Sequence, residues 1–172
     1  NVLLKRGYIA DQRIANEKAR AASKEKQRKT YHNTELLLKN YRTISWMLEC
    51  FPSTIAEELD KPFESTDEMI EKLENRMESV KKTRLVLGRI NDALTVLKKK
   101  PEDGERLYEL IYLTYISADV LNHNELLYRL NLSSRHYYRL REQAIAVISL
   151  RLWAAPNSET DAWLEVLSAL EE

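Results

Sequence analysis

Apolar positions recur along the chain at intervals of three and four residues, which is the period of amphipathic helices. The first such run covers residues 33–50, and Pro52 is expected to end that helix because proline lacks a backbone N–H. A short helix is expected at 55–59, where Thr54 and Glu57 have the spacing of a capping box. Residues 1–32 offer almost no apolar face, so they are predicted to be a polar helix or a mobile arm.

The clearest helix start in the sequence is Ser65, which Glu68 follows at capping-box spacing. A long helix is expected from there to about Lys99. Its apolar line repeats every seven residues, which fits either a dimeric coiled coil, and hence a homodimer, or a helix packed on the 33–50 helix of the same chain. We favour the second interpretation, because Arg84 and Asn91 interrupt a strict heptad. The line consists of Leu73, Val80, Leu87 and Leu94.

The segment 99–104 joins Pro and Gly with charged residues and is predicted to separate two modules. An amphipathic helix follows, then a short helix at about 125–130 and a long helix from Ser133 to about Trp153. A terminal amphipathic helix is expected at 159–170. The predicted division is a basic arm or helix at 1–32, a helical hairpin or, as the alternative, a dimerisation module at 33–100, a helix-turn-helix domain at 101–156, and a C-terminal helix at 157–172.

Composition narrows the fold class and the cellular setting. The chain has 172 residues, 44% of them hydrophobic, with three Gly and four Pro, which predicts an all-α protein. No apolar run of about 18 residues occurs, so neither a transmembrane helix nor membrane binding is expected. The opening NVLLKRGYIADQR lacks the apolar region of a signal peptide, and Cys50 is the only cysteine. We therefore expect a reducing, cytoplasmic setting.

The zero net charge hides an uneven distribution along the chain. Residues 1–50 hold 11 Lys or Arg and five Asp or Glu. Near the other end, four arginines lie between Arg135 and Arg151, where Glu142 is the single acid. A polyanion senses local charge because salt screens exposed charges beyond about 10 Å. The neutral total is therefore compatible with binding to nucleic acid.

Residues 125–140 have the pattern of two helices joined by a tight turn at Asn131, a residue type that tolerates the left-handed conformation. Arginine can bind guanine, and Ser, Tyr and Arg can bind phosphate. The alternative is a solvated helix face with no ligand. The residues expected to face inward are Leu126, Leu130, Leu132, Tyr137 and Leu140. The candidate DNA-facing residues are Ser134, Arg135, His136, Tyr138 and Arg139, with Arg141 near the edge of that face.

The stretch NELLYRLNLSSRHYYRLREQAIAVISLRLW, preceded by RINDALTVLKKKPEDGERLYELIYLTYI, resembles the C-terminal part of the ArpU/RinA-type phage late transcriptional regulators. It is similar more distantly to region four of sigma factors. The resemblance implies an activator of late phage or prophage genes in a bacterial host cell. This activator would bind double-stranded DNA near a promoter, with RNA polymerase as a partner. It also implies that Ser134, Arg135, His136, Tyr138, Arg139 and Arg141 face the DNA.

Two further segments and one rival function stay open at this level. The basic residues 18–29 can contact the DNA backbone or remain solvated. The terminal helix can dock a partner through Trp163, Leu167 and Leu170, or fold back on its own chain, which we favour because an exposed apolar stripe is costly. The rival to DNA binding is a helical protein-interaction adaptor or inhibitor that uses a helix-turn-helix as a scaffold.

Catalysis finds little support in the sequence. Cys50 lies in an apolar and aromatic context and is expected in the core rather than as a nucleophile. The three histidines, His32, His123 and His136, lack metal-ligand spacing, and no Gly-rich phosphate loop occurs. We therefore expect no enzyme, no metal site and no cofactor.

Overall fold

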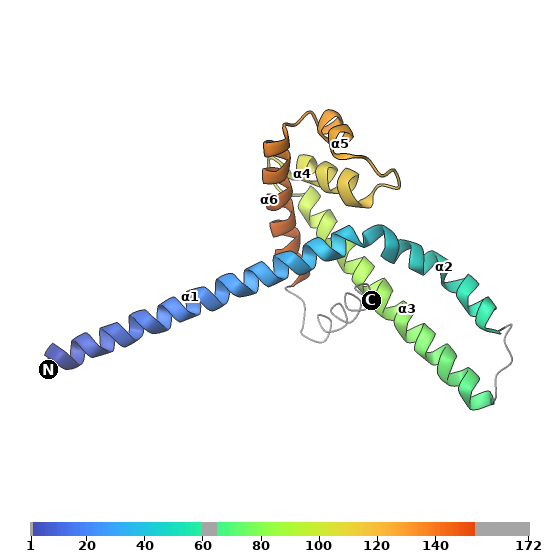
Figure 1. Ribbon diagram of the computed structural model, residues 1–172, viewed down its shortest axis with the longest axis horizontal. Helices are drawn as coiled ribbons and strands as arrows, with labels where there is room; N and C mark the ends of the chain where they lie inside the picture. The colour runs from blue at the N-terminus through green and yellow to red at the C-terminus, as the bar shows by residue number, and fades with distance from the viewer. Residues whose placement is uncertain (1, 60–64, 154–172) are drawn as a thin grey trace.

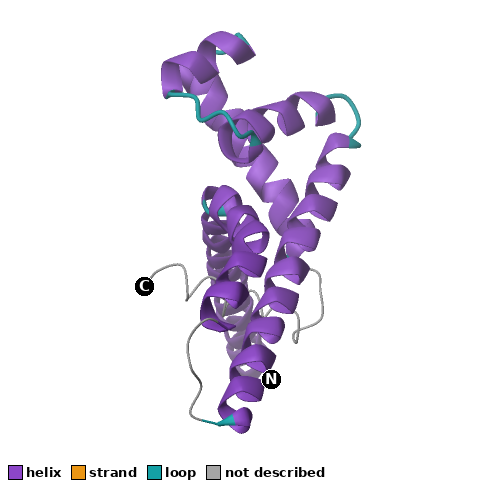
Figure 2. Cartoon of the chain, turned by 90° about the vertical axis from the view of Figure 1, so that its right-hand side faces the viewer, coloured by secondary structure: helices purple, strands orange, loops and turns teal. Residues whose placement is uncertain are grey.

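All regular structure in the described part of the chain is helical, so the all-α prediction is confirmed. The computed structural model describes residues 2–59 and 65–153 (Figures 1 and 2). None of the helices in these ranges combines the length and apolarity needed to cross a membrane. In chain order the elements are α1 (Val2–Lys39), α2 (Tyr41–Leu59), α3 (Thr66–Lys98), α4 (Gly104–Ile111), the π-helical turn η1 (Tyr112–Ile116), α5 (His123–Leu130) and α6 (Ser134–Leu152).

Helix α1 has two parts with different surroundings. Its residues 6–29 are exposed to solvent, whereas Thr34, Leu37 and Leu38 near its C-terminal end are buried. Figure 1 shows the N-terminal part of α1 projecting far from the other helices. The arm predicted at 1–32 is thus helical where it is described, and it continues without a break into the core.

The helix break expected at Pro52 lies instead at Asn40, which is a correction to the sequence prediction. The backbone N–H and the side-chain amide of Asn40 both donate to the carbonyl of Leu36, at 3.1 and 2.9 Å. Helix α2 then continues through Pro52 to Leu59, so the separate helix expected at 55–59 is its last part. Proline removes the N–H that the Leu48 carbonyl would accept, and the helix continues despite that loss.

Helix α3 begins where the sequence predicted, with the Ser65 hydroxyl accepting a hydrogen bond from the Glu68 N–H at 3.1 Å. Its C-terminal half packs on α2 of the same chain, and the Tyr41 hydroxyl donates to the Asn91 side-chain oxygen at 2.8 Å. An intrachain partner was the favoured interpretation of this helix. The buried apolar residues of α3 follow spacings of three and four: Val86, Ile90, Ala93, Leu94 and Leu97.

The turn between α3 and α4 requires a glycine at its end. Glu102 adopts a positive φ of 73°, which brings α4 back against the end of α3. A Cβ added at Gly104 would lie 2.7 Å from the Lys98 carbonyl oxygen and 2.8 Å from that of Leu97. Only glycine therefore lets the first turn of α4 approach this backbone so closely.

One hydrophobic core extends across the module boundary predicted near residue 101. Helices α3 and α4 both pack on α6, and α6 also packs on α1. The region predicted as a hairpin and the region predicted as a DNA-binding domain therefore share their core. Its largest fully buried side chains are Leu37, Leu38, Ile44, Ile90, Leu97, Leu107, Leu110, Ile111, Ile145, Ile148 and Leu152.

The expected terminal helix, with Trp163, Leu167 and Leu170, lies outside the described residues.

Candidate functional site

Local hydrogen bonds fix the start of α5 and the start of α6, and Asn131 forms the turn between the two helices. A reciprocal capping box starts α5: the Glu125 N–H donates to the Asn122 side chain at 3.0 Å, and the Asn122 N–H donates to the Glu125 carboxylate at 2.8 Å. The helix ends at Asn131, which has the left-handed conformation predicted for it, with φ 53° and ψ 50°. Ser133 then caps α6, as predicted, by accepting from the His136 N–H at 3.3 Å.

Buried residues on one side of α6 determine which residues its opposite side presents. Tyr137 and Leu140 are buried in the core, together with Leu126 of α5. Arg135 and Arg139 therefore point to solvent on the first two turns of the helix. Ser134 and Tyr138 are exposed beside them, and His136 is half-buried.

His123 of α5 contacts this face, which the sequence reasoning did not predict. Its Nε2 lies 3.1 Å from the Ser134 hydroxyl, and its ring stacks on the Tyr138 ring at 5.4 Å between centroids. These contacts hold two residues of the exposed face in defined positions. The available signal was the capping box at Asn122 and Glu125, which places His123 in the first turn of the short helix.

Arg141 differs from the other candidate residues. Its side chain is only 19% exposed, and its guanidinium donates to the Tyr115 hydroxyl at 2.7 Å and to the Glu35 carboxylate. It therefore connects α6 to η1 and α1, whereas Arg135 and Arg139 face solvent. The helical pattern of α6 alone could not predict these contacts of Arg141, because Glu35 and Tyr115 are distant from it in sequence.

Burial and the neighbouring groups together determine the ionisation of Tyr115 and Arg141. Desolvation raises the pKa of the Tyr115 hydroxyl to about 12, against the opposite effect of the Arg141 charge. Burial alone would lower the pKa of Arg141, but Tyr115 and Glu35 outweigh it and the pKa is raised. The phenol is therefore neutral and the guanidinium charged at neutral pH.

A second set of contacts fastens α1 to the C-terminal half of α6. The Ser149 hydroxyl donates to the Thr34 hydroxyl oxygen at 2.8 Å, and the Trp153 indole N–H donates to the same oxygen at 2.9 Å. Thr34 and Ser149 are both buried. Farther out, a groove of about 560 Å³ separates the helices, and Lys26 is the one charged residue in its lining.

The electrostatics of the exposed face favour an anion. The first turn of α6 contains no acid, and its free N–H groups carry the positive end of the helix dipole. Arg151, by contrast, is paired with Asp92 at 2.7 Å. Within residues 2–59 and 65–153, no three His, Cys, Asp or Glu side chains gather closely enough to hold a metal ion. Arg135 and Arg139 are thus the cations that this face of α6 can offer a ligand.

Comparison of the chain with protein-family models, with curated proteins and with solved structures gave no match.

Proposed function

We propose that the protein is a sequence-specific DNA-binding transcription regulator, with α5, the turn at 131–133 and α6 forming a helix-turn-helix. In this proposal α6 enters the major groove with its first two turns and α5 braces it from behind. The resemblance to phage late regulators adds the expected context, which is a promoter of late genes and contact with RNA polymerase.

The observation that carries the proposal is the division of α6 into a buried and a basic side. Tyr137 and Leu140 anchor the helix, and Arg135 and Arg139 lie one turn apart on the solvent side. Two arginines at this spacing can reach successive base edges in a groove about 12 Å wide. They are the residues to which we assign base recognition, with half-buried His136 at the margin.

The other residues of the face suit the sugar-phosphate backbone. Ser134 and Tyr138 each offer a hydroxyl, and the N-terminus of α6 adds free N–H groups. His123 already holds both side chains in place, so little conformational entropy is lost when they meet phosphate. Arg141 was predicted in this set, but we assign it to the attachment of α1 because of its contacts with Glu35 and Tyr115.

The test begins with selection of bound duplexes from a random pool at low salt. On the enriched sequence, Arg135→Ala and Arg139→Ala should each weaken binding by about 1–3 kcal/mol, or roughly 5- to 150-fold. Arg106→Ala, which removes an exposed arginine of α4, is the matched control and should bind as the wild type does. The proposal fails if no sequence is enriched, or if both α6 variants stay folded and bind with unchanged affinity.

A protein-interaction adaptor is the second candidate, favoured by apolar side chains on α2 and α3. Trp46, Met47 and Met77 are 62%, 45% and 54% exposed, and large apolar side chains in water often mark a protein contact. The dependence of binding affinity on salt concentration distinguishes the two functions. DNA binding weakens steeply as salt rises, whereas an apolar contact does not.

A further inference from the structure

The projecting part of α1 is a long helix that is exposed to solvent along its length. Residues 6–29 are all exposed, and they carry eight Lys or Arg against three Asp or Glu. A helix gains most of its stability in proteins when an apolar face packs against other residues. Residues 6–29 lack such packing because they are all exposed. The charge of this segment therefore points to a polar, negatively charged partner.

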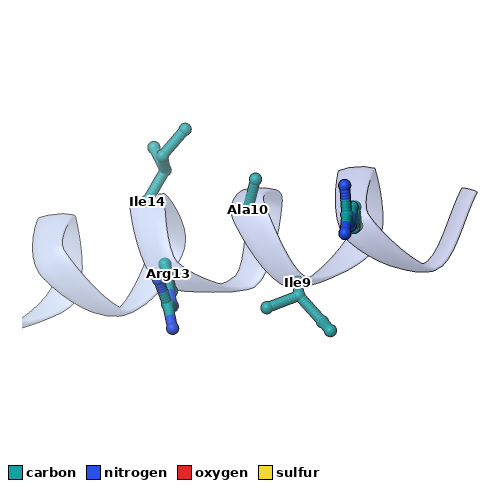
Figure 3. A pocket seen from close by; sticks show the side chains of 5 residues that line it. Ile9, Ala10, Arg13 and Ile14 are labelled. Carbon is teal, nitrogen blue, oxygen red and sulfur yellow. The ribbon is translucent and has the colours of Figure 1, made fainter. Parts of the chain in front are cut away.

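Four of these cations fall on one side of the helix, which we call the arm stripe: Arg6, Arg13, Arg20 and Lys24. Separations of seven, seven and four residues place them within about 40° of one another around the helix axis. All four are exposed, and none pairs with an acid among the described residues; Glu17 is the acid on this side of the helix, between Arg13 and Arg20. Figure 3 shows Arg13 and Ile9 leaving the lower side of α1 and Ile14 leaving the upper side, so Ile14 does not share the arm stripe, whereas Ile9 lies beside it.

The same side of α1 continues into the contacts with α6. Tyr31 lies seven residues after Lys24, and Glu35, four residues farther, binds Arg141 in the first half of α6. The arm stripe therefore faces the side of α1 on which the N-terminal half of α6 stands.

The contacts of α6 with α1 lie on the side of α6 that carries Arg135. Ser149 and Trp153, which bind Thr34 of α1, follow Arg135 by 14 and 18 residues. Those separations are close to whole helical turns, so α1 crosses α6 on the side that carries Arg135. The crossing at Ser149 lies roughly 15 Å along the helix from Arg139. Figure 1 shows α1 crossing α6 near the C-terminal end of α6.

We propose that the arm stripe binds the phosphates of duplex DNA next to the site that α6 reads. This inference rests on the proposed function, because it places the DNA against the N-terminal turns of α6. A duplex in that position lies in the angle between α6 and α1, with the arm stripe facing it. From Arg6 to Lys24 the arm rises roughly 27 Å, which matches about eight base pairs.

Energetics favour phosphate over a second copy of the chain as the partner of the arm stripe. Arg20 and Lys24 are like charges at i,i+4, which destabilise an isolated helix. Phosphates would neutralise them and release counterions, whereas another arm stripe would add to the repulsion. The contacts of Thr34 and Glu35 already fix the root of the arm, so its direction is set before DNA arrives.

The test compares two triple variants of the full chain on a selected duplex with flanks of about 10 base pairs. The first, Arg13→Gln with Arg20→Gln and Lys24→Gln, removes three charges of the arm stripe. The control, Lys18→Gln with Lys26→Gln and Lys29→Gln, removes three charges from the other side of the same helix. Glutamine forms helices about as well as lysine and arginine, so circular dichroism should show both variants folded.

We expect the salt dependence of DNA binding to separate the variants. The slope of log K against log salt should fall by about 2.7 for the arm-stripe variant, since each phosphate contact contributes about 0.9, and by less than one for the control. Hydroxyl-radical footprinting should show about eight protected base pairs on one flank, lost only in the arm-stripe variant.

The failure of this inference is distinguishable from that of the proposed function. If the wild type binds no duplex, both proposals are wrong. If Arg135→Ala weakens binding but the two triple variants have equal slopes and equal footprints, the arm-stripe inference alone is overturned.

Discussion

Tyr115 and Arg141 form a polar contact in a mostly buried place where α1, η1 and α6 meet. The Arg141 guanidinium donates to the Tyr115 hydroxyl, and burial raises the pKa of that hydroxyl to about 12. A phenolate there would gain from the arginine charge, but it would lose more through desolvation. Tyr115 should therefore ionise about two pH units above an ordinary tyrosine.

Ultraviolet absorbance of tyrosinate should show this as a late step near pH 12 that Tyr115→Phe removes. Because the folded pKa lies above the unfolded one, this group's contribution to the free energy of unfolding is intact below pH 10. It should fall by about 2–3 kcal/mol as the pH rises from about 10 to 12. Tyr128→Phe, at a position 90% exposed, is the control and should keep the late step. A late step that persists in folded Tyr115→Phe would contradict the assignment.

Sequence patterns located the exposed residues of α6 better than their contacts. The spacing of Tyr137 and Leu140 was enough to place Arg135 and Arg139 in solvent. It could not show that Arg141 binds Glu35, because that pairing joins residues 106 positions apart. It missed His123 for the same reason, since the stacking on Tyr138 depends on how α5 meets α6.

Among the elements, the junction of α3 and α4 offers the sharpest test of local packing. Gly104→Ala places a Cβ against the carbonyls of Leu97 and Lys98 and should lower the free energy of unfolding by about 1–3 kcal/mol. Gly88→Ala is the control, because nothing lies within 4 Å of its added Cβ. It should raise the free energy by about 0.5–1 kcal/mol. Urea denaturation measures both, and equal stabilities of the two variants would show that the close approach is absent.

Helix ends were predictable where a local cap defines them. Ser65 and Ser133 accept the hydrogen bonds that their sequences indicated, and Asn131 takes the left-handed turn. The end expected at Pro52 was wrong, since α2 continues through Pro52 to Leu59. The break lies at Asn40, whose side-chain amide donates to the Leu36 carbonyl of the preceding turn. An asparagine in a helical sequence has several uses, and the choice among them depends on tertiary packing.

At the scale of the whole molecule, the shared core predicts cooperative unfolding of α3 and α6. Ile90→Ala removes a fully buried side chain of α3 and should lower stability by about 2–4 kcal/mol. Native-state hydrogen exchange should show the same decrease for core amides of α6, although they lie beyond the predicted module boundary. Ile14→Ala, on the exposed part of α1, should change neither helix. Unaltered exchange in α6 of the Ile90 variant would mean that the two regions unfold independently.

The unbroken course of α1 from solvent into the core links the length of the arm to its rotation. Each residue added between Lys24 and Tyr31 would move the arm stripe outward by about 1.5 Å and turn it by about 100° about the helix axis. Seven added residues would return it to within about 20° of its original direction, whereas two would turn it to the opposite side. Changes of arm length that preserve the helical phase are therefore expected to come in steps of about seven residues.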